Sequence, residues 1–523
     1  MTFAEVRTRF APSPTGYLHI GGVRTALFNW LFARRHGGQF LLRIDDTDQE
    51  RNVESAMAPI LHGFRWLGID WDEGPEVDGP YAPYYQSQRL PRYKDAVAQL
   101  LAGGFAYRDY ATTDELQAER QAAEREKRPF LYSRRWMAES DEAAARFEAE
   151  GRKAVVRLKM PREGKLLIPD LVRGDVEFEW AREQDHVVQR ADGTCLYHLA
   201  SVVDDYDFKI SHVIRAEEHL SNTPRQIFIA QSLGFPLPEY AHLPYVAEPG
   251  SKNKLSKRKL DKYLKNRDFA QVNEHGLAIA QALGLATTAD TFNPVIVDFY
   301  EQVGYLPDAI INYLVLLGWS LDDKTEFFTR QEMIDSFSLE RVTKAPASFD
   351  PKKLWAFQDH AMQQLSLDEK VERMLPFLVR AGLVAEADRI AAKGIVSTIV
   401  SAAGDRLKVA GDVLAYADFF FQADDAYQFD AAAVEKHIKQ PETTARLARY
   451  RERLAGLDAF DVAALERSMQ EFLDAEQIKI GAVIHAIRVA VTGKAVGPGL
   501  YDCLAILGKE KSLKRLDRAL KLS

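Results

Sequence analysis

The hydrophobic pattern near the N-terminus changes from a period of two to a helical period at one short turn. Residues 6–11 alternate between apolar and polar side chains, which is typical of a half-buried strand. Apolar side chains then recur at helical spacing over residues 23–31, until two glycines at 37–38 end the pattern. The turn at residues 12–22 contains further glycines and one histidine, His19. The pattern predicts a strand, a turn and a helix whose free N–H groups face the turn and suit a phosphate.

Strand and helix patterns keep alternating to about Gly104. Residues 40–44 predict a second strand that ends in the acidic cluster 45–48, and residues 54–67 predict the helix that follows it. In a parallel sheet, ligands bind at the carboxyl ends of the strands. We therefore expect the acidic cluster to lie near the His19 turn.

The alternation is interrupted and then resumes. Residues 111–150 are charged, rich in alanine and helical in pattern, and short strand-like segments follow at 154–158 and 176–178. A strand at 212–215 then restores the alternation, and Ser221 is predicted to cap the next helix. Two halves of a doubly wound α/β sheet, split by an inserted domain, explain this order.

Composition indicates a large soluble enzyme. The chain has 523 residues, of which 46% are hydrophobic and 28% are charged, enough for three or four domains. Residues 1–5 lack the pattern of a secretion signal and no apolar run approaches a membrane span, so a cytoplasmic location is expected and no membrane partner. The net charge of −8 disfavours a general polyanion binder. Two cysteines, Cys195 and Cys503, are too few for a disulfide framework.

Two motifs narrow the function. Taken alone, a glycine turn more often has a structural role than a binding role, and a single histidine usually packs in the protein interior. However, residues 12–22 read PSPTGYLHIGG, and residues 254–258 read KLSKR within a run that has eight basic residues and one acidic residue between Lys252 and Arg267. The first string resembles the HIGH signature of class I aminoacyl-tRNA synthetases in the form found in the glutamate and glutamine branch. The second is similar to their KMSKS loop. The chain thus resembles the bacterial glutamyl-tRNA synthetases over almost its whole length.

The resemblance implies a class I Rossmann-type catalytic domain with an inserted acceptor-end domain, followed by an all-helical anticodon-binding region. The domains it implies are 1–110, the first half of the catalytic domain; 111–190, the acceptor-end-binding insertion; 191–260, the second half with the KLSKR loop; 261–345, a helical stem-contact region with an insertion at about 262–294; and 346–523, the anticodon-binding domains. The insertion at 262–294 has alanine and leucine spacing that predicts a small helical piece.

The resemblance also assigns the nucleotide site. His19 and Lys257 are the expected catalytic residues, because growing charge on the phosphoryl oxygens needs a donor and a cation. The expected ATP-binding residues are Ser13, His19, Gly22, Glu218, Lys254, Lys257 and Arg258. Mg²⁺ is expected to accompany ATP without a dedicated protein site. The neighbouring Glu218, His219 and His212 do not form a metal-binding motif, and the family's cysteine-rich zinc site has no counterpart between Tyr107 and Arg128, so no structural zinc is predicted.

The glutamate site is assigned in the same way. The expected glutamate-binding residues are Arg9, Ala11, Ser13, Asp45, Tyr197, Ser201 and Arg215. An arginine fork recognises a carboxylate in a bidentate way that a glutamine side chain does not match. Asp45 stands where the family has glutamate, and Ser201 where asparagine is common. Three structural readings stay open: Arg9 as an ion pair on a strand face, Tyr197 as a core aromatic, and Asp45 as a cap.

The function implied is glutamate–tRNA ligation: L-glutamate and ATP form glutamyl-adenylate, and the 2′-hydroxyl of the tRNA's terminal adenosine accepts the acyl group, releasing AMP and diphosphate. An ungapped alignment puts Gln363 where the family has an arginine that favours tRNA-Glu, so tRNA-Gln is a candidate second substrate. A monomer is expected. The helical pattern after Ala345 disfavours glutaminyl-tRNA synthetase and the short relative that modifies a tRNA base. The remaining alternative is a tRNA-binding or regulatory protein with an impaired synthetase site, which Asp45 supports best.

Overall fold

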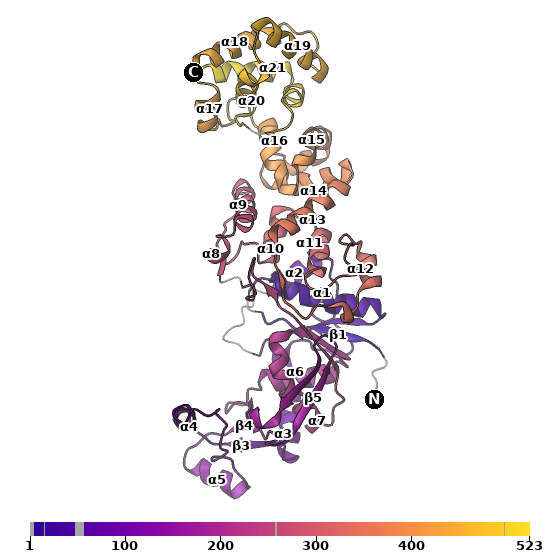
Figure 1. The fold of residues 1–523 in the computed structure, drawn as a ribbon, viewed down its shortest axis with the longest axis vertical. Coiled ribbons are helices and arrows are strands. Elements are labelled where there is room, and N and C mark those ends of the chain that lie inside the picture. Colours follow the sequence, from indigo (N-terminus) through magenta and orange to yellow (C-terminus); the bar gives the residue numbers. More distant parts are fainter. Residues whose placement is uncertain (1–4, 15, 48–56, 257–258, 496, 523) are drawn as a thin grey trace. The chain divides into compact units, whose positions relative to one another are not determined.

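The computed structural model describes residues 5–14, 16–47, 57–256, 259–495 and 497–522 (Figure 1). The chain divides into two compact units. The first unit comprises Met1–Asn266, Val295–Asp298 and Ile310–Pro351, and the second comprises Arg267–Pro294, Phe299–Ala309 and Lys352–Ser523. The first is α/β and carries the candidate site, whereas the second is helical.

The predicted strand, turn and helix open the first unit. Strand β1 (Arg7–Phe10) pairs in parallel with β2 (Gln39–Leu42), and helix α1 (Ile20–Arg35) connects them. The helix packs on both strands, and this contact buries its apolar side chains. Helices α2 (Met57–Leu67) and α3 (Leu90–Ala102) follow. This part matches the alternation expected from the sequence, within the residues described.

The second half of the catalytic fold repeats the pattern. Its elements are α6 (Tyr197–Asp207), β8 (His212–Ala216), α7 (Thr223–Ser232) and β9 (Glu239–Leu243). Strands β8 and β9 are parallel, and the Ser211 amide donates to the Arg7 carbonyl at 3.0 Å, so β1 and β8 lie side by side. The split α/β fold predicted from the sequence is confirmed. A core shared by both halves is built from Leu41, Phe208, Ile210, Val213, Ile227 and Tyr240.

The segment between the halves forms two kinds of structure. Strands β3 (Ala106–Asp109), β4 (Val155–Leu158) and β7 (Val187–Gln189) make an antiparallel sheet, and the helices of this segment are α4 (Thr113–Arg125) and α5 (Asp141–Ala149), both labelled in Figure 1. The hairpin of β5 (Lys165–Asp170) and β6 (Gly174–Glu179) instead joins the catalytic strands, in the order β6-β5-β9-β8. Part of the segment predicted as an insertion therefore extends the catalytic sheet.

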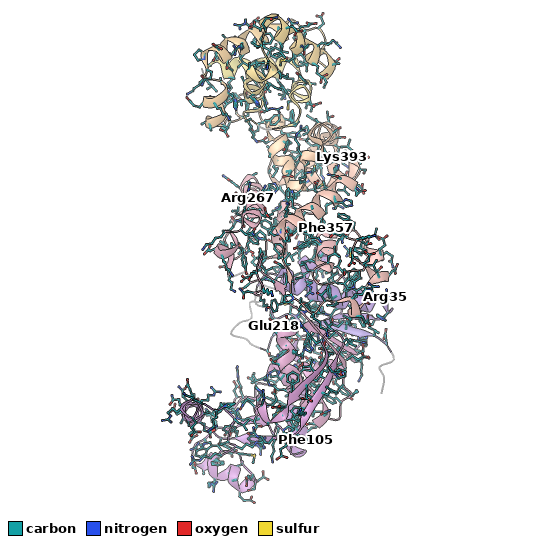
Figure 2. The ribbon with its side chains drawn as sticks, in the orientation of Figure 1. Arg35, Phe105, Glu218, Arg267, Phe357 and Lys393 are labelled. Carbon is teal, nitrogen blue, oxygen red and sulfur yellow. The ribbon has the colours of Figure 1, made fainter. Side chains whose placement is uncertain are left out.

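The predicted cap of α7 was wrong. A 3₁₀ turn, Glu217–Asn222, leads directly into α7, so the N-cap residue is Asn222 and its side chain makes no capping hydrogen bond. Ser221 lies inside the turn. Pro224 does lie in the first turn of the helix, where its missing N–H costs nothing. The turn places Glu218 at the end of β8, and this side chain is labelled in Figure 2.

The remainder of the first unit supports the basic loop. Strand β10 (Val246–Ala247) leads into the loop and pairs in parallel with β11 (Ala347–Ser348). The Leu255 amide donates to the Val246 carbonyl, and the Ser256 amide donates to the Tyr263 hydroxyl at 2.9 Å. Helices α8 (Leu260–Tyr263) and α12 (Arg330–Ser336) also belong to this unit.

The second unit is helical, as predicted for the C-terminal part. Its main helices are α9 (Arg267–Ala282), α13 (Pro351–Gln364), α14 (Leu367–Arg380), α15 (Arg389–Ala403), α16 (Val413–Phe421), α17 (Ala431–His437), α18 (Pro441–Ala455), α19 (Val462–Glu476), α20 (Ile484–Thr492) and α21 (Leu500–Leu520). Helices α10 (Val297–Val303) and α11 (Pro307–Val315) contain residues of both units. The helix α9 agrees with the helical piece predicted within 262–294. Buried Arg515 on α21 ties the C-terminal helices together through Asp424 and the carbonyls of Phe419 and Val491.

Across the described residues, no helix is both long enough and apolar enough to cross a membrane.

Candidate active site

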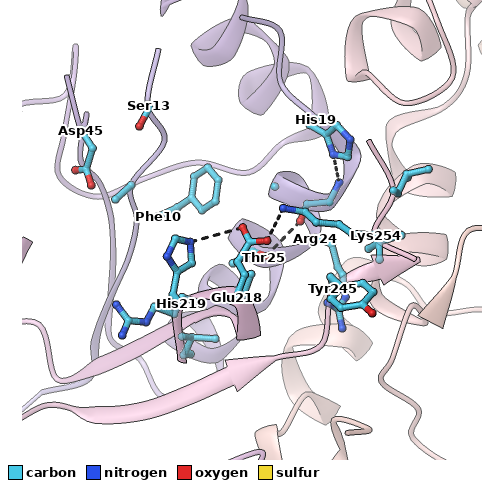
Figure 3. A pocket seen from close by; sticks show the side chains of 18 of the residues that line it. Phe10, Ser13, His19, Arg24, Thr25, Asp45, Glu218, His219, Tyr245 and Lys254 are labelled. Carbon is cyan, nitrogen blue, oxygen red and sulfur yellow. Dashed lines mark hydrogen bonds and ion pairs between the residues drawn. The ribbon is translucent and has the colours of Figure 1, made fainter. Parts of the chain in front are cut away.

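A cavity of about 740 Å³ lies at the carboxyl ends of β1, β2 and β8 (Figure 3). Most of the site residues predicted from sequence meet there. The predicted residues that line it are Arg9, Ala11, Ser13, His19, Gly22, Asp45, Tyr197, Arg215, Glu218 and Lys254. Lys257 and Arg258 lie outside the described residues. Strand ends that are far apart in sequence thus form one polar site, as the parallel topology requires.

His19 is the N-cap residue of α1. Its Nδ1 accepts a hydrogen bond from the Gly21 amide at 2.9 Å, drawn as a dashed line in Figure 3. Since Nδ1 is the acceptor, the neutral ring carries its proton on Nε2. A Cβ at Gly21 would lie 3.2 Å from Nδ1, so glycine leaves room for this ring position. The turn therefore holds a hydrogen-bond donor beside the positive end of the helix.

The ends of β1 and β2 carry a network of buried charges. Arg9 donates to both carboxylate oxygens of Asp205, at 3.0 and 3.2 Å. Arg43 donates to both oxygens of Asp45, at 2.7 and 3.2 Å, and to Asp205 at 2.8 Å. Arg9 therefore makes an ion pair, one of the structural readings that the sequence left open, and still lines the cavity.

The pKa values of the two carboxyls respond differently to this network. Burial raises the pKa of Asp45, and Arg43 and Arg9 only partly oppose that effect. Burial also acts to raise the pKa of Asp205, but Arg9 and Arg43 outweigh it and hold the pKa below its ordinary value. Asp205 accepts hydrogen bonds from two arginines, Arg9 and Arg43, whereas Asp45 accepts them from Arg43 alone. The extra direct cation explains why the pKa of Asp205 is lowered and that of Asp45 is not.

Ser201 does not line the cavity. Its side chain is buried, and its hydroxyl accepts a hydrogen bond from Arg43 at 3.3 Å. Ser201 is connected to the cavity by Arg43, which also contacts Asp45. Its direct contact with substrate stays a prediction.

Arg215 differs from the other two strand-end arginines in its partners. Its guanidinium donates to His242, Gln226 and Thr223, at 3.0, 2.6 and 2.9 Å. Among the described residues, no carboxylate oxygen lies within 4.0 Å of it. Burial lowers the pKa of this guanidinium, and Tyr197 and Tyr240 partly oppose the effect. The cavity thus contains a buried cation without a direct counter-ion.

The basic loop approaches the same cavity. Lys254 Nζ lies 2.5 Å from Glu218 Oε2, and both side chains are about half exposed (Figure 3). The Lys254–Glu218 pair brings the loop to the end of β8. An ion pair this exposed adds little to stability, because water solvates both charges well.

Sequence reasoning missed several lining residues, among them Arg24, Arg43 and His219. Burial lowers the pKa of Arg24 to about 9, and burial together with Arg215 lowers the pKa of His219 to about 4. Arg43 was detectable, since it lies directly after β2 and two residues before Asp45. Arg24 lies near the start of α1, which also carries Arg34 and Arg35, and nothing in the pattern distinguishes it from a surface arginine.

The remaining predicted positions lie elsewhere. Gln363 is exposed on α13 and donates to Asp359 at 3.0 Å. Both cysteines are buried. In the part of the chain that the structure describes, no group of three or more histidine, cysteine or acidic side chains is arranged to hold a metal ion.

The split α/β fold, the His19 turn and the basic loop at one cavity define a class I aminoacyl-tRNA synthetase. The family model for the catalytic domain of tRNA synthetases class I (E and Q) matches residues 5–291 and 292–356, and that for the anticodon binding domain matches residues 369–520. The chain belongs to the glutamate and glutamine family of class I tRNA synthetases. The resemblance seen in the sequence is confirmed.

Curated relatives and solved structures agree with this family. The chain is 43% identical to a glutamate–tRNA ligase of Moorella thermoacetica, over 98% of both chains. It is 42% identical to glutamate–tRNA ligase 1 of Caldanaerobacter subterraneus, over 99% of this chain and 98% of the relative. A crystal structure of a glutamate tRNA ligase from Elizabethkingia meningosepticum, in complex with its amino acid, has a TM-score of 0.80 at 31% identity and covers 99% of each chain.

Proposed function

We propose that this protein attaches L-glutamate to tRNA-Glu in two steps that consume ATP. One observation carries the proposal: Arg215 is a buried cation at the cavity, bonded to neutral partners and without a carboxylate within 4.0 Å among the described residues. Such a guanidinium suits the side-chain carboxylate of glutamate and rejects a neutral amide, which would leave its charge unpaired. The relatives named as glutamate–tRNA ligases support the same substrate.

In the first step, an oxygen of the glutamate α-carboxylate attacks the α-phosphorus of ATP, and the bond to diphosphate breaks. Negative charge then grows on the phosphoryl oxygens. The Nε2–H group of His19 donates a hydrogen bond to these oxygens, and Lys257 adds a positive charge from the basic loop. Lys254 and Arg258 hold the outer phosphates, and Mg²⁺ accompanying ATP would neutralise part of the phosphate charge.

The glutamate backbone is assigned to the ends of β1 and β2. Asp45 accepts a hydrogen bond from the α-ammonium group. Ala11 and Ser13 line the end of β1, and Tyr197 closes over the substrate. Aspartate is shorter than glutamate by about 1.5 Å. The bidentate contact from Arg43 holds the Asp45 carboxylate in one orientation, which favours a fixed acceptor at this position.

In the second step, the 2′-hydroxyl of the terminal adenosine attacks the carbonyl carbon of glutamyl-adenylate, and the bond to AMP breaks. A second cavity, of about 530 Å³, supports an entry for the tRNA end, because Tyr197 lines both cavities. Its walls combine aromatic and cationic side chains, the mixture that binds single-stranded nucleic acid. These include Phe130, Tyr132, Arg120, Arg157 and Arg190.

The finer assignments complete the proposal. We propose tRNA-Gln as a second substrate, because Gln363 lacks the charge that an arginine would offer to a tRNA base or phosphate. We also propose a monomer that acts in the cytoplasm, where tRNA is charged for protein synthesis. A regulatory protein with an impaired site is not favoured, since His19, Arg215 and Lys254 meet at one cavity.

The test is ATP–diphosphate exchange with the purified protein, glutamate and tRNA, followed by transfer of labelled glutamate to each purified tRNA. We expect exchange that depends on glutamate and that needs much more glutamate in Arg215→Gln. If no exchange occurs with or without tRNA, the proposed enzymatic activity is contradicted. If the protein charges tRNA-Glu but not tRNA-Gln, only the proposal of tRNA-Gln as a second substrate is contradicted.

A further inference from the structure

The partners of Arg215 include one that connects it to a buried carboxylate. Its Nε donates to His242 Nε2 at 3.0 Å, and His242 Nδ1 lies 2.6 Å from Asp170 Oδ2. The side chains of His242 and Asp170 are both 0% exposed. Asp170, His242 and Arg215 therefore form a continuous line of hydrogen bonds that ends at the cavity.

The direction of each hydrogen bond in this line is set by chemistry. An ionised carboxylate only accepts, so His242 carries its proton on Nδ1 and presents the Nε2 lone pair to the Arg215 Nε–H. Burial acts to raise the pKa of Asp170, but bonds from His242 and the Arg173 amide outweigh it and hold the pKa below its ordinary value. Burial lowers the pKa of His242, which keeps the ring neutral.

Asp170 is itself held in position by backbone donors. Its Oδ1 accepts from the amides of Val172 and Arg173 at 3.0 and 2.8 Å, and the His242 amide lies 3.1 Å from Oδ2. Asp170 is the last residue of β5 and pairs with Tyr240 of β9. The carboxylate thus comes from the hairpin that the middle segment adds to the catalytic sheet.

We propose that Asp170 and His242 are positioning residues that orient the Arg215 guanidinium for the side-chain carboxylate of glutamate and so sharpen the choice of glutamate over glutamine. This inference rests on the proposed role of Arg215. The carboxylate stabilises the arginine's charge through a neutral ring, without occupying the guanidinium edge that the substrate needs. A direct carboxylate partner, such as Asp205 beside Arg9, would compete with the substrate.

Replacing Asp170 by asparagine should reverse the donor and acceptor roles in this line of hydrogen bonds. The asparagine oxygen must face the amides of Val172 and Arg173, which leaves its NH₂ group facing His242 Nδ1. The ring then moves its proton to Nε2, where it meets the Arg215 Nε–H, and two donors face each other. The same logic explains why a triad aspartate cannot be replaced by asparagine in serine proteases. Arg215 would turn away from its present position.

The experiment compares Asp170→Asn, His242→Leu and His242→Gln in the full chain, by glutamate-dependent exchange in the presence of tRNA. For Asp170→Asn and His242→Leu, we expect the KM for glutamate to rise at least about tenfold, as when the outer partner of a metal ligand is removed. The KM for ATP should change less than about twofold, and the preference for glutamate over glutamine should fall. Glutamine at 242 can donate to Asp170 and accept from Arg215, so His242→Gln should restore most of the affinity.

A matched control comes from the second unit. Asp412 Oδ1 lies 2.6 Å from His275 Nε2, and its Oδ2 accepts from the amides of Lys408 and Val409, the same arrangement without an arginine. Asp412→Asn should leave the KM for glutamate unchanged. If Asp170→Asn behaves like this control, or raises both KM values equally, the inference is overturned.

Arg215→Gln separates this inference from the proposed function. If it raises the KM for glutamate while Asp170→Asn does not, only the positioning role fails; if neither does, the proposed glutamate site fails. Histidine ¹⁵N spectra of the wild-type protein test the line without any variant, with His242→Gln used for assignment. We expect the neutral Nδ1–H form at His242, and an Nε2–H form would contradict the inference.

Discussion

Arg43 holds Asp45 with two hydrogen bonds, from Nε to Oδ1 at 2.7 Å and from Nη2 to Oδ2 at 3.2 Å. Arg43 is 1% exposed and Asp45 is 7% exposed, so water screens the pair very little. Arg43, which the sequence did not point to, therefore fixes the orientation of Asp45, the residue that stands where the family has glutamate.

Arg43→Met should reduce both stability and activity. It leaves Asp45 and Asp205 without a shared cation, and removing one partner of a buried ion pair costs about 3–5 kcal/mol. We expect a lower melting temperature of the first unit and a higher KM for glutamate, measured by calorimetry and exchange. Arg182→Met removes an exposed pair with Glu179 and should change neither. An unchanged KM would contradict the role assigned to the pair.

Two substitutions at His19 separate helix capping from catalysis. Asparagine is a good N-cap residue, so His19→Asn should keep the stability of α1, whereas His19→Ala should lose about 1 kcal/mol. Both remove the Nε2 donor, and we expect kcat to fall about 100- to 1,000-fold in each, with little change in the KM for glutamate. Single-turnover adenylate formation measures this step. Normal kcat in His19→Asn would exclude the donor role.

Lys254→Met should weaken ATP binding alone. Lys254 lines the cavity, whereas Lys262 of the same basic run pairs with Glu248 and does not line it. We expect the KM for ATP to rise about tenfold in Lys254→Met, since one charge-assisted contact is lost. Lys262→Met is the control and should leave this KM unchanged. Equal effects of the two variants would indicate a general charge effect.

Acid should destabilise the protein through His219, a partly buried histidine whose lowered pKa keeps it neutral in the folded chain. Burial and Arg215 lower the pKa of His219 to about 4, from an ordinary value of 6.5. Between these values the unfolded chain binds a proton that the folded chain does not, so stability falls as pH falls from 6.5 to about 4. His219→Gln should weaken this loss of stability, measured as the melting temperature at several pH values between 4 and 6.5. The effect should be small, because the side chain is 36% exposed and water screens its charge. His62→Gln, at an exposed histidine, should keep the wild-type slope.

Gln363→Arg should change the choice of tRNA. A fixed positive charge replaces a neutral amide that is exposed on α13. If Gln363 permits tRNA-Gln, the variant should charge tRNA-Glu normally and tRNA-Gln about tenfold less well, measured as kcat/KM for each tRNA. Lys352→Arg, at another exposed position of α13, controls for the surface change. Unchanged relative charging would remove Gln363 from tRNA selection.

Much of the fold was predictable because its signals are local. The change of period at residues 12–22, the glycines after α1 and the helical spacing after Ala345 each depend on neighbours a few residues away. The cap of α7 was missed because a 3₁₀ turn and a loop have similar sequences, so Ser221 resembled a cap. The hairpin β5–β6 was assigned to the insertion, since nothing local shows which sheet a strand joins.

The order of residues was sufficient to predict the family, the α/β and helical parts, and many of the residues that line the cavity, because short motifs and periodic patterns are carried by adjacent positions. Only the folded chain decides the partners of those residues. Asp205 meets Arg9, Arg43 meets Asp45, and Asp170 reaches Arg215 through His242. Except for Arg43 and Asp45, which lie two residues apart, these side chains come from segments that are distant in sequence. The energies of buried charges also depend on distance and dielectric in three dimensions.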